Sequence, residues 1–223
     1  MPGVKRQASP PARRQRAERT RARIVLAAAR LFRARGYAAT TMDAIAADAK
    51  VAVQTVYFTF HTKGELLEAV VDAAIAGDES TTTQRTAWWL QIESEPDAAR
   101  RFEFMVDAAA DVADRLTPLL PELQAAASSD PAMADRVRTR LTERRRFMER
   151  VVAATARRGQ LRVGLEPGVA TDIVFAVAGT ELFGLLVGVC GWTVAEWKTW
   201  TLGTLRGQVL GLDGPSVPAS QET

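Results

Sequence analysis

Residues 40–70 read TTMDAIAADAKVAVQTVYFTFHTKGELLEAV, a stretch with helical spacing that is broken twice. Thr41 is a favourable N-cap for a short helix over 42–49, whose apolar residues fall on one face. Residues 50–52 interrupt this spacing, and a second short helix is predicted over 53–60. Two short helices joined by such a turn are typical of a helix-turn-helix, whose second helix lies in the major groove of DNA.

Helices are also predicted on both sides of this unit. A first helix runs from about Glu18 to Arg35, and Gly36 ends it, as glycine often does after the last helical residue. A further helix begins at Thr62, a cap residue with a glutamate three positions later. No stretch alternates with period two, so the sequence predicts an all-α protein.

The charge is divided unevenly along the chain. Residues 1–64 contain thirteen lysines and arginines against three acidic residues, a formal charge of +10. The remaining residues contain sixteen basic and 23 acidic side chains, a formal charge of −7. A basic N-terminal part followed by an acidic remainder indicates a protein that binds a polyanion through the first part and has a different function in the second.

The same stretch resembles the signature of the tetracycline-repressor (TetR) family of transcriptional regulators. A basic lead-in, a first helix that ends in RGY, the pairs TT and IA, a T-x-Y-x-x-F core and a lysine before the next helix follow the family's spacing over about 18–75. The resemblance implies an all-α fold of about nine helices. It consists of a three-helix DNA-binding domain followed by a larger domain for effector binding and dimerisation.

The resemblance also implies roles for individual residues. Four residues match family positions that contact the DNA backbone: Thr40, Thr41, Tyr57 and Lys63. Tyr57 has the alternative of packing in the core with its hydroxyl exposed. His61 is either a phosphate donor or a solvated residue at a helix end.

Base contacts are predicted from the second short helix. Gln54 and Thr55 face outward if Val56 and Phe60 face inward. Glutamine can pair with adenine through two hydrogen bonds, and threonine can contact a thymine methyl group. Val53 is a neighbouring candidate for a methyl contact.

Three positions depart from the family pattern: Lys50, Ala52 and Thr59. Glycine is common where Lys50 stands, and a positive φ there would cost lysine on the order of 1 kcal/mol. Serine commonly caps the recognition helix where Ala52 stands, and the loss of such a cap costs ~1 kcal/mol. Lys50 is also a candidate for a phosphate contact.

The termini are predicted to be disordered over 1–16 and 213–223, because both are rich in proline or polar residues and poor in large apolar ones. Arg13, Arg14 and Arg16 either enter the minor groove as a disordered arm or supply only nonspecific attraction to DNA. The expected domains are then 17–77 for DNA binding and 78–212 for effector binding and dimerisation.

Within the larger domain, helices are predicted over 81–93, 97–115, 131–158, 167–190 and 194–211, with a short one over 118–127. The last two long helices are apolar on more than one face, which predicts that they meet their two-fold mates in a homodimer. The alternative is that they only complete one monomer's core. The predicted interface residues are Val177, Leu182, Leu185, Val189, Trp197, Trp200 and Leu205.

An effector pocket is predicted in the middle of this domain. Aromatic side chains and methionines around a cavity suit a largely apolar small molecule. The candidates are Trp88, Trp89, Phe102, Met105, Phe147, Phe175 and Glu181. Acidic Asp107 and Asp111 are further side chains that would favour a cationic ligand if they faced the cavity.

Other functions find little support in the sequence. The chain has one cysteine, Cys190, and one histidine, so no catalytic set, metal-ligand spacing or cofactor motif is predicted. No export signal or membrane span is expected, which favours the cytoplasm. The prediction is a DNA-binding repressor that a small molecule releases from a palindromic operator. The alternatives are an architectural DNA-binding protein without an effector and an all-helical enzyme.

Overall fold

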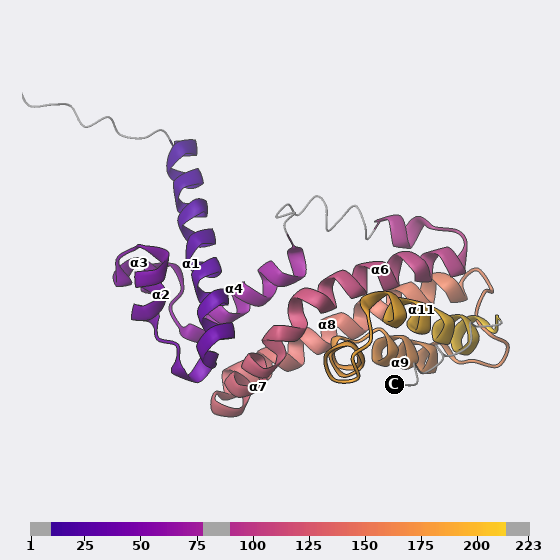
Figure 1. Cartoon of the computed structure of the whole chain (residues 1–223). Coiled ribbons are helices and arrows are strands. Elements are labelled where there is room, and N and C mark those ends of the chain that lie inside the picture. The colour runs from indigo at the N-terminus through magenta and orange to yellow at the C-terminus, as the bar shows by residue number, and fades with distance from the viewer. Residues whose placement is uncertain (1–9, 78–89, 213–223) are drawn as a thin grey trace, which may run out of the picture.

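The computed structural model describes residues 10–77 and 90–212, and every regular element in these two ranges is helical. This confirms the all-α prediction. We call residues 10–77 the head and residues 90–212 the body. The head contains α1 (Pro10–Ala39), α2 (Met42–Ala49), α3 (Val53–Thr59) and α4 (Lys63–Ala76) (Figure 1).

The body is an elongated bundle that continues from the head (Figure 1). Residues 90–94 are helical. The remaining elements are α6 (Ala98–Leu116), η1 (Thr117–Leu119), α7 (Leu120–Ser129), α8 (Pro131–Ala156), α9 (Pro167–Val177), α10 (Thr180–Phe183), η2 (Gly184–Val189), α11 (Val194–Leu205) and η3 (Arg206–Leu210). Residues 81–89 of the helix predicted over 81–93 lie outside the described residues.

Two apolar clusters hold the molecule together. The first contains residues of all four head helices, with Ile24, Ile45, Val56 and Leu66 completely buried. Leu119 of η1 joins the same cluster, so the head and the body share one core rather than meeting at a hinge. The second cluster lies within the body. Because the first cluster includes residues of α7 and α8, these two body helices pack directly against the head.

The start of α1 differs from the prediction. Residues 10–16 are helical, so the prediction that they are disordered was wrong for this part of the arm. Proline is compatible with a first helical turn, and the following arginines, glutamine and alanines have high helix propensity. Arg14 and Glu18 add an ion pair one turn apart, at 3.1 Å. Gly36 breaks the helix as predicted, with a φ of 81° and a ψ of 159°.

The predicted helix over 167–190 is divided in two. Gly179 is extended (φ −83°, ψ 148°) and separates α9 from α10. A Cβ atom there would lie 3.1 Å from the carbonyl oxygens of Phe175 and Ala176, so a side chain would crowd the backbone. Gly184 lies close to η1, since a Cβ atom there would be 3.1 Å from Thr117 Cγ2, whereas a Cβ atom at Gly188 would have no neighbour within 4 Å.

The segment Pro167–Val189 has the length and composition of a membrane span. Its charged residues are nevertheless paired with α8. Asp172 contacts Arg145 at 2.8 Å, and Glu181 contacts Arg144 at 3.0 Å. These ion pairs place the segment against the rest of the body, which is the environment of a helix in a globular domain.

Candidate nucleic-acid interface

The turn between α2 and α3 positions the second short helix. Lys50 ends α2 in the left-handed conformation (φ 53°, ψ 50°), so the condition under which lysine costs stability relative to glycine is met. Arg23 of α1 donates to the Lys50 carbonyl oxygen at 3.0 Å and so fastens the turn to the first helix. Ala52 occupies the N-cap of α3 without a side-chain hydrogen bond. The strained lysine and the missing cap are therefore both present.

The outer face of α3 carries Gln54, Tyr57 and Phe58, which are spaced as neighbours on one helical face. Tyr57 is 49% exposed and Phe58 is 86% exposed. Val56 and Phe60 are buried, as predicted, and fix this orientation. An aromatic ring left in solvent on a recognition helix is suited to contact thymine methyl groups or sugars.

Phe58 was missed by the sequence reasoning, although its spacing from Gln54 was a usable signal. Thr55, which was predicted to face outward beside Gln54, lies at the edge of the exposed face and is half-buried. Its carbonyl oxygen accepts a hydrogen bond from the Thr59 hydroxyl at 2.7 Å. Val53, in the first turn, is also half-buried.

Thr40 does not present its hydroxyl to DNA. Its side chain is 1% exposed, and the hydroxyl donates to the carbonyl oxygens of Leu31 (3.2 Å) and Gly36 (2.8 Å). The hydroxyl therefore joins the residue before α2 to carbonyl groups near the end of α1. The prediction of a phosphate contact through this side chain was therefore wrong.

The Lys63 side chain also makes hydrogen bonds within the head. Its ammonium donates to the carbonyl oxygens of Tyr37 (2.7 Å) and Thr40 (3.0 Å) and lies 4.3 Å from the centre of the Tyr37 ring. Burial lowers the pKa of Lys63. The lysine joins the first turn of α4 to the end of α1, so it positions the head's elements whether or not it also contacts phosphate.

The remaining candidates lie at the surface. Thr41 is exposed, and its hydroxyl caps α2 by accepting from the Ala44 N–H at 3.1 Å. Lys50 is exposed beside α3. His61 is exposed as well, and its Nδ1 lies 3.2 Å from Glu65 Oε2. Hydrogen bonding from His61 lowers the pKa of Glu65.

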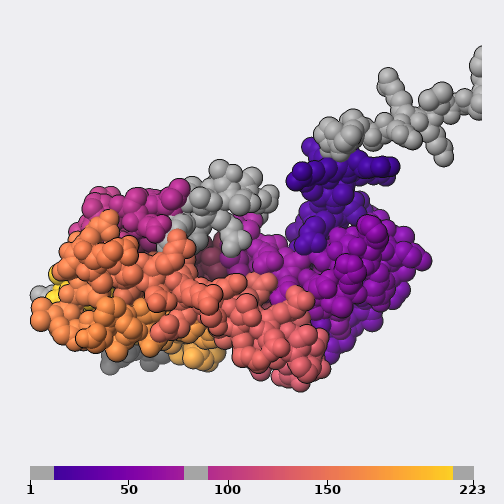
Figure 2. Space-filling view, turned by 180° about the vertical axis from the view of Figure 1, so that it is seen from behind, coloured from indigo at the N-terminus to yellow at the C-terminus, as the bar shows by residue number. Residues whose placement is uncertain are grey.

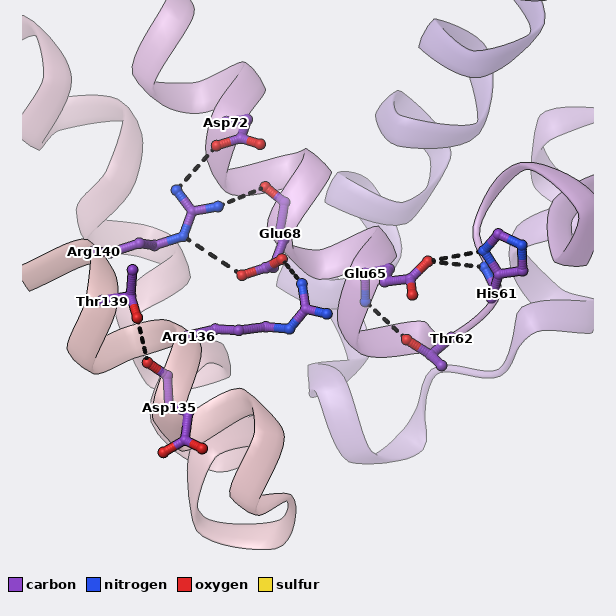
Figure 3. A network of polar contacts seen from close by, with 9 residues as sticks. All are labelled: His61, Thr62, Glu65, Glu68, Asp72, Asp135, Arg136, Thr139 and Arg140. Carbon is purple, nitrogen blue, oxygen red and sulfur yellow. Dashed lines mark hydrogen bonds and ion pairs between the residues drawn. The ribbon is translucent and has the colours of Figure 1, made fainter. Parts of the chain in front are cut away.

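A cluster of charges joins the head to the body (Figure 3). Glu68 of α4 points between two arginines of α8 and forms an ion pair with each, Arg136 and Arg140. Arg140 also contacts Asp72 at 3.0 Å. We call these four residues the α4–α8 clasp. The sequence signal was the one-turn spacing of the partners on each helix, but nothing in the sequence told which helices would pair.

The body also holds the end of α1 and the end of α4. Glu122 of α7 accepts a hydrogen bond from the Tyr37 N–H, directly after the break at Gly36. Arg115 of α6 donates to the Ala74 carbonyl oxygen at 2.7 Å. With the clasp, these contacts tie three points of the head to three different body helices.

Four of the predicted pocket residues belong to the apolar cluster of the body. Phe102 and Met105 are fully buried in the body core, while Phe147 and Phe175 are half-buried. Glu181 is held by Arg144, which also lies 4.3 Å from the Phe175 ring. Burial opposes ionisation of Glu181, but hydrogen bonds from Arg144 outweigh it and lower the pKa of the carboxyl. Trp88 and Trp89 lie outside the described residues, so the pocket stays a prediction.

The predicted interface residues divide into two groups. Leu185 and Val189 are 56% and 77% exposed, and Val177, Leu182 and Trp200 are half-buried. Trp197 and Leu205 are completely buried within this chain, so the prediction that they meet a partner was wrong. They point inward because α11 packs against α6 and α9 on that side.

Comparison with known proteins agrees with this geometry. The model of the family described as bacterial regulatory proteins, tetR family, matches residues 24–70. No curated protein sequence matches the chain. The matched segment contains the buried face of α1, the α2–α3 unit and the first turns of α4.

Several solved structures share the fold over almost the whole chain. The SmeT–triclosan complex is 20% identical, covering 92% of this chain and 100% of that chain, with a TM-score of 0.70. SmeT is described as the repressor of the Stenotrophomonas maltophilia multidrug efflux pump SmeDEF. The fatty acid degradation regulator FadR from Bacillus halodurans is 16% identical, with coverages of 91% and 97% and a TM-score of 0.69. FadR from Bacillus subtilis, in complex with stearoyl-CoA, is 16% identical, with coverages of 82% and 96% and a TM-score of 0.67.

Proposed function

We propose that this chain, a member of the TetR family, is a transcriptional repressor that binds an operator through α3 and is released from it by a small molecule. One observation carries the proposal. The exposed face of α3 presents Gln54, Tyr57 and Phe58 on a head whose sequence has a formal charge of +10 over residues 1–64. A short exposed helix on a basic surface suits insertion into the major groove.

The proposed contacts fall into two kinds. Gln54 reads a base edge, with Phe58 beside it against thymine methyl groups or sugars. Tyr57, Thr41 and Lys50 bind phosphates and fix the position of the helix on the duplex. The buried Thr40 and the enclosed Lys63 support this surface from behind.

We further propose a homodimer in the cytoplasm that binds a palindromic operator. Two recognition helices read two half-sites when they are about 34–36 Å apart. The exposed side chains Leu185 and Val189 suit burial against a second copy of the chain. No cofactor or catalytic residue is part of the proposal.

The effector is proposed to bind in the body and to act through the contacts that tie the body to the head. Two structural relatives are described with ligands that contain a large apolar part, triclosan and the acyl chain of stearoyl-CoA. The α4–α8 clasp and the Glu122 hydrogen bond connect α8 and α7 directly to the head. A ligand changes DNA affinity only as far as it prefers one head arrangement over another.

The proposal is tested in two steps. A duplex is first selected by the full chain from a random library, and its affinity is measured by fluorescence anisotropy. Probes with a large apolar part, triclosan and stearoyl-CoA among them, are then screened for a rise in the melting temperature, which reports binding to the folded state. We expect a probe that binds to weaken duplex binding at least tenfold at saturation. Unchanged affinity at saturation contradicts ligand-induced release and favours an architectural DNA-binding protein.

A further inference from the structure

The first turns of α1 stand outside the compact part of the molecule. Side chains 13–19 are exposed, and continuous burial of α1 begins only at Ile24. The helix projects past α2 and α3 and away from the body (Figure 1), and it stands clear of the surface in the space-filling view (Figure 2). We call residues 10–20 the helical arm. Its length is about 15 Å at 1.5 Å per residue.

The helical spacing of α1 determines which arginines of the arm lie on the side of the helix that faces the head. Ile24, Ala27 and Leu31 form the stripe that packs on the head's core. Steps of three and four residues continue this stripe backwards through Thr20 to Arg16 and Arg13. The stripe is therefore apolar where it meets the core and cationic where the helix leaves it.

Two contacts fix the orientation of this face. Arg23 reaches the Lys50 carbonyl oxygen on one side, and Arg21 lies 4.4 Å from the centre of the Phe60 ring on the other. The stripe lies between them, so Arg13 and Arg16 continue along the side of α1 on which α2 and α3 pack. Arg14 and Arg19 lie to either side of this stripe, and Arg14 is paired with Glu18.

The geometry points to a second DNA contact: we propose that Arg13 and Arg16 bind backbone phosphates of the duplex that flanks each half-site. The inference rests on the proposed function, because it requires a duplex on α3. A helix with side chains is about 10–12 Å across, whereas the minor groove is about 6 Å wide, so a helical arm does not enter that groove. Phosphates at the groove edge remain within reach of arginines.

The length of the arm indicates how many flanking base pairs the contact would need. About 15 Å of helix corresponds to roughly four base pairs at 3.4 Å each. A duplex that ends at the half-sites therefore lacks the phosphates that Arg13 and Arg16 would bind. The contact carries no base specificity, because phosphates are the same in every sequence.

The test uses the full chain and the selected duplex with flanks of either ten or no additional base pairs. The variant Arg13→Gln/Arg16→Gln is compared with Arg14→Gln/Arg19→Gln, which removes the same charge from the neighbouring faces of the helix. Glutamine preserves helix propensity, and circular dichroism confirms that each variant is folded. The logarithm of affinity is measured against the logarithm of salt concentration.

We expect Arg13→Gln/Arg16→Gln to reduce the salt slope on the flanked duplex by about 0.9 for each lost phosphate contact, up to about 3.6 for the four in a dimer. The control variant should change it by less than half as much. Removing the flanks should weaken binding of the native chain but not of Arg13→Gln/Arg16→Gln. Equal slope changes in both variants, or no effect of the flanks, overturn the inference while leaving the proposed function standing. Failure to select any duplex overturns both.

Discussion

The turn before α3 shows what a single residue contributes to this head. Lys50 adopts a backbone conformation that favours glycine, and Ala52 leaves the first turn of α3 without a side-chain cap. Both features weaken the recognition helix by on the order of 1 kcal/mol each. The head tolerates them because Arg23 and the buried Val56 hold the turn and the helix from behind.

The missing cap leads to a stability prediction. Ala52→Ser adds one hydroxyl, which can accept a hydrogen bond from an N–H in the first turn of α3. We expect the free energy of unfolding, measured in urea, to rise by about 1 kcal/mol. The native chain is the matched control, since the two proteins differ by one oxygen atom. An unchanged or lower free energy would show that the turn does not place residue 52 as a cap.

The outer face of α3 leads to a prediction about specificity. Gln54→Ala should lower affinity for the selected duplex by about 1–3 kcal/mol and relax the preference at one base position. Tyr57→Phe, which removes only the phenolic hydroxyl, should weaken selected and random duplexes by similar factors. Both are measured by anisotropy competition. Equal effects of the two variants on selected and random DNA would contradict the assigned roles.

At this scale the sequence predicts local features better than remote ones. The positive φ of Lys50, the uncapped Ala52 and the break at Gly36 all follow from short-range patterns. The partners of Lys63 do not, because they lie more than twenty residues away at the end of α1. Those of the Thr40 hydroxyl depend on how the chain folds back after the break at Gly36. Both side chains therefore make contacts within the head, whereas the family resemblance assigned them to the DNA backbone.

Among the elements, α4 connects the DNA-binding surface to the body. Glu68 has a side chain only 18% exposed and contacts two arginines of α8, whereas Asp72 is 62% exposed. A partly buried carboxylate shared by two guanidinium groups contributes more than an exposed pair. In the proposed mechanism, the clasp is where a change in α8 would reach the head.

This contrast gives a matched pair of variants. Glu68→Gln should lower the free energy of unfolding by about 1.5–3 kcal/mol, because it weakens charged hydrogen bonds and leaves two arginines without their carboxylate. Asp72→Asn should lower it by less than about 1 kcal/mol. Urea unfolding of the full chain measures both. If Asp72→Asn costs as much as Glu68→Gln, the clasp does not centre on Glu68.

Element boundaries were predictable where caps or glycines mark them. Thr41 and Thr62 begin α2 and α4 as expected, and α6 and α8 agree with the predicted ranges within two residues. The start of α1 and the interruption at Gly179 were not foreseen. In the first case helix propensity outweighed a polar composition. In the second a single glycine inside an apolar helical pattern adopts an extended conformation.

For the whole molecule, the shared core makes the head and the body one mechanical unit. Leu119 and Met133 of the body are buried in the same cluster as Ile45 and Val56 of the head. The sequence predicted two domains from charge and punctuation, but it contained no signal for a common core. The exposed apolar side chains of the last helices remain the surface that a second copy would cover.

The proposed dimer is tested on that surface. Leu185→Asp places a charge on an exposed apolar side chain of η2 and should convert the dimer to a monomer, with loss of binding to the palindromic duplex. Val163→Asp is the control, because Val163 is 99% exposed in the segment between α8 and α9. Sedimentation equilibrium measures both. A native chain that is monomeric, or a dimeric Leu185→Asp variant, contradicts the assignment of this surface.

The central claim is that α3 of this head reads DNA sequence. The most direct measurement is the ratio of affinities of the full chain for the duplex it selects from a random library and for a scrambled duplex of equal length and salt concentration. The account predicts a ratio of at least about 10³, as for other specific DNA-binding proteins, and a smaller ratio for Gln54→Ala. A ratio near one in the native chain, or a ratio that Gln54→Ala leaves unchanged, would contradict it.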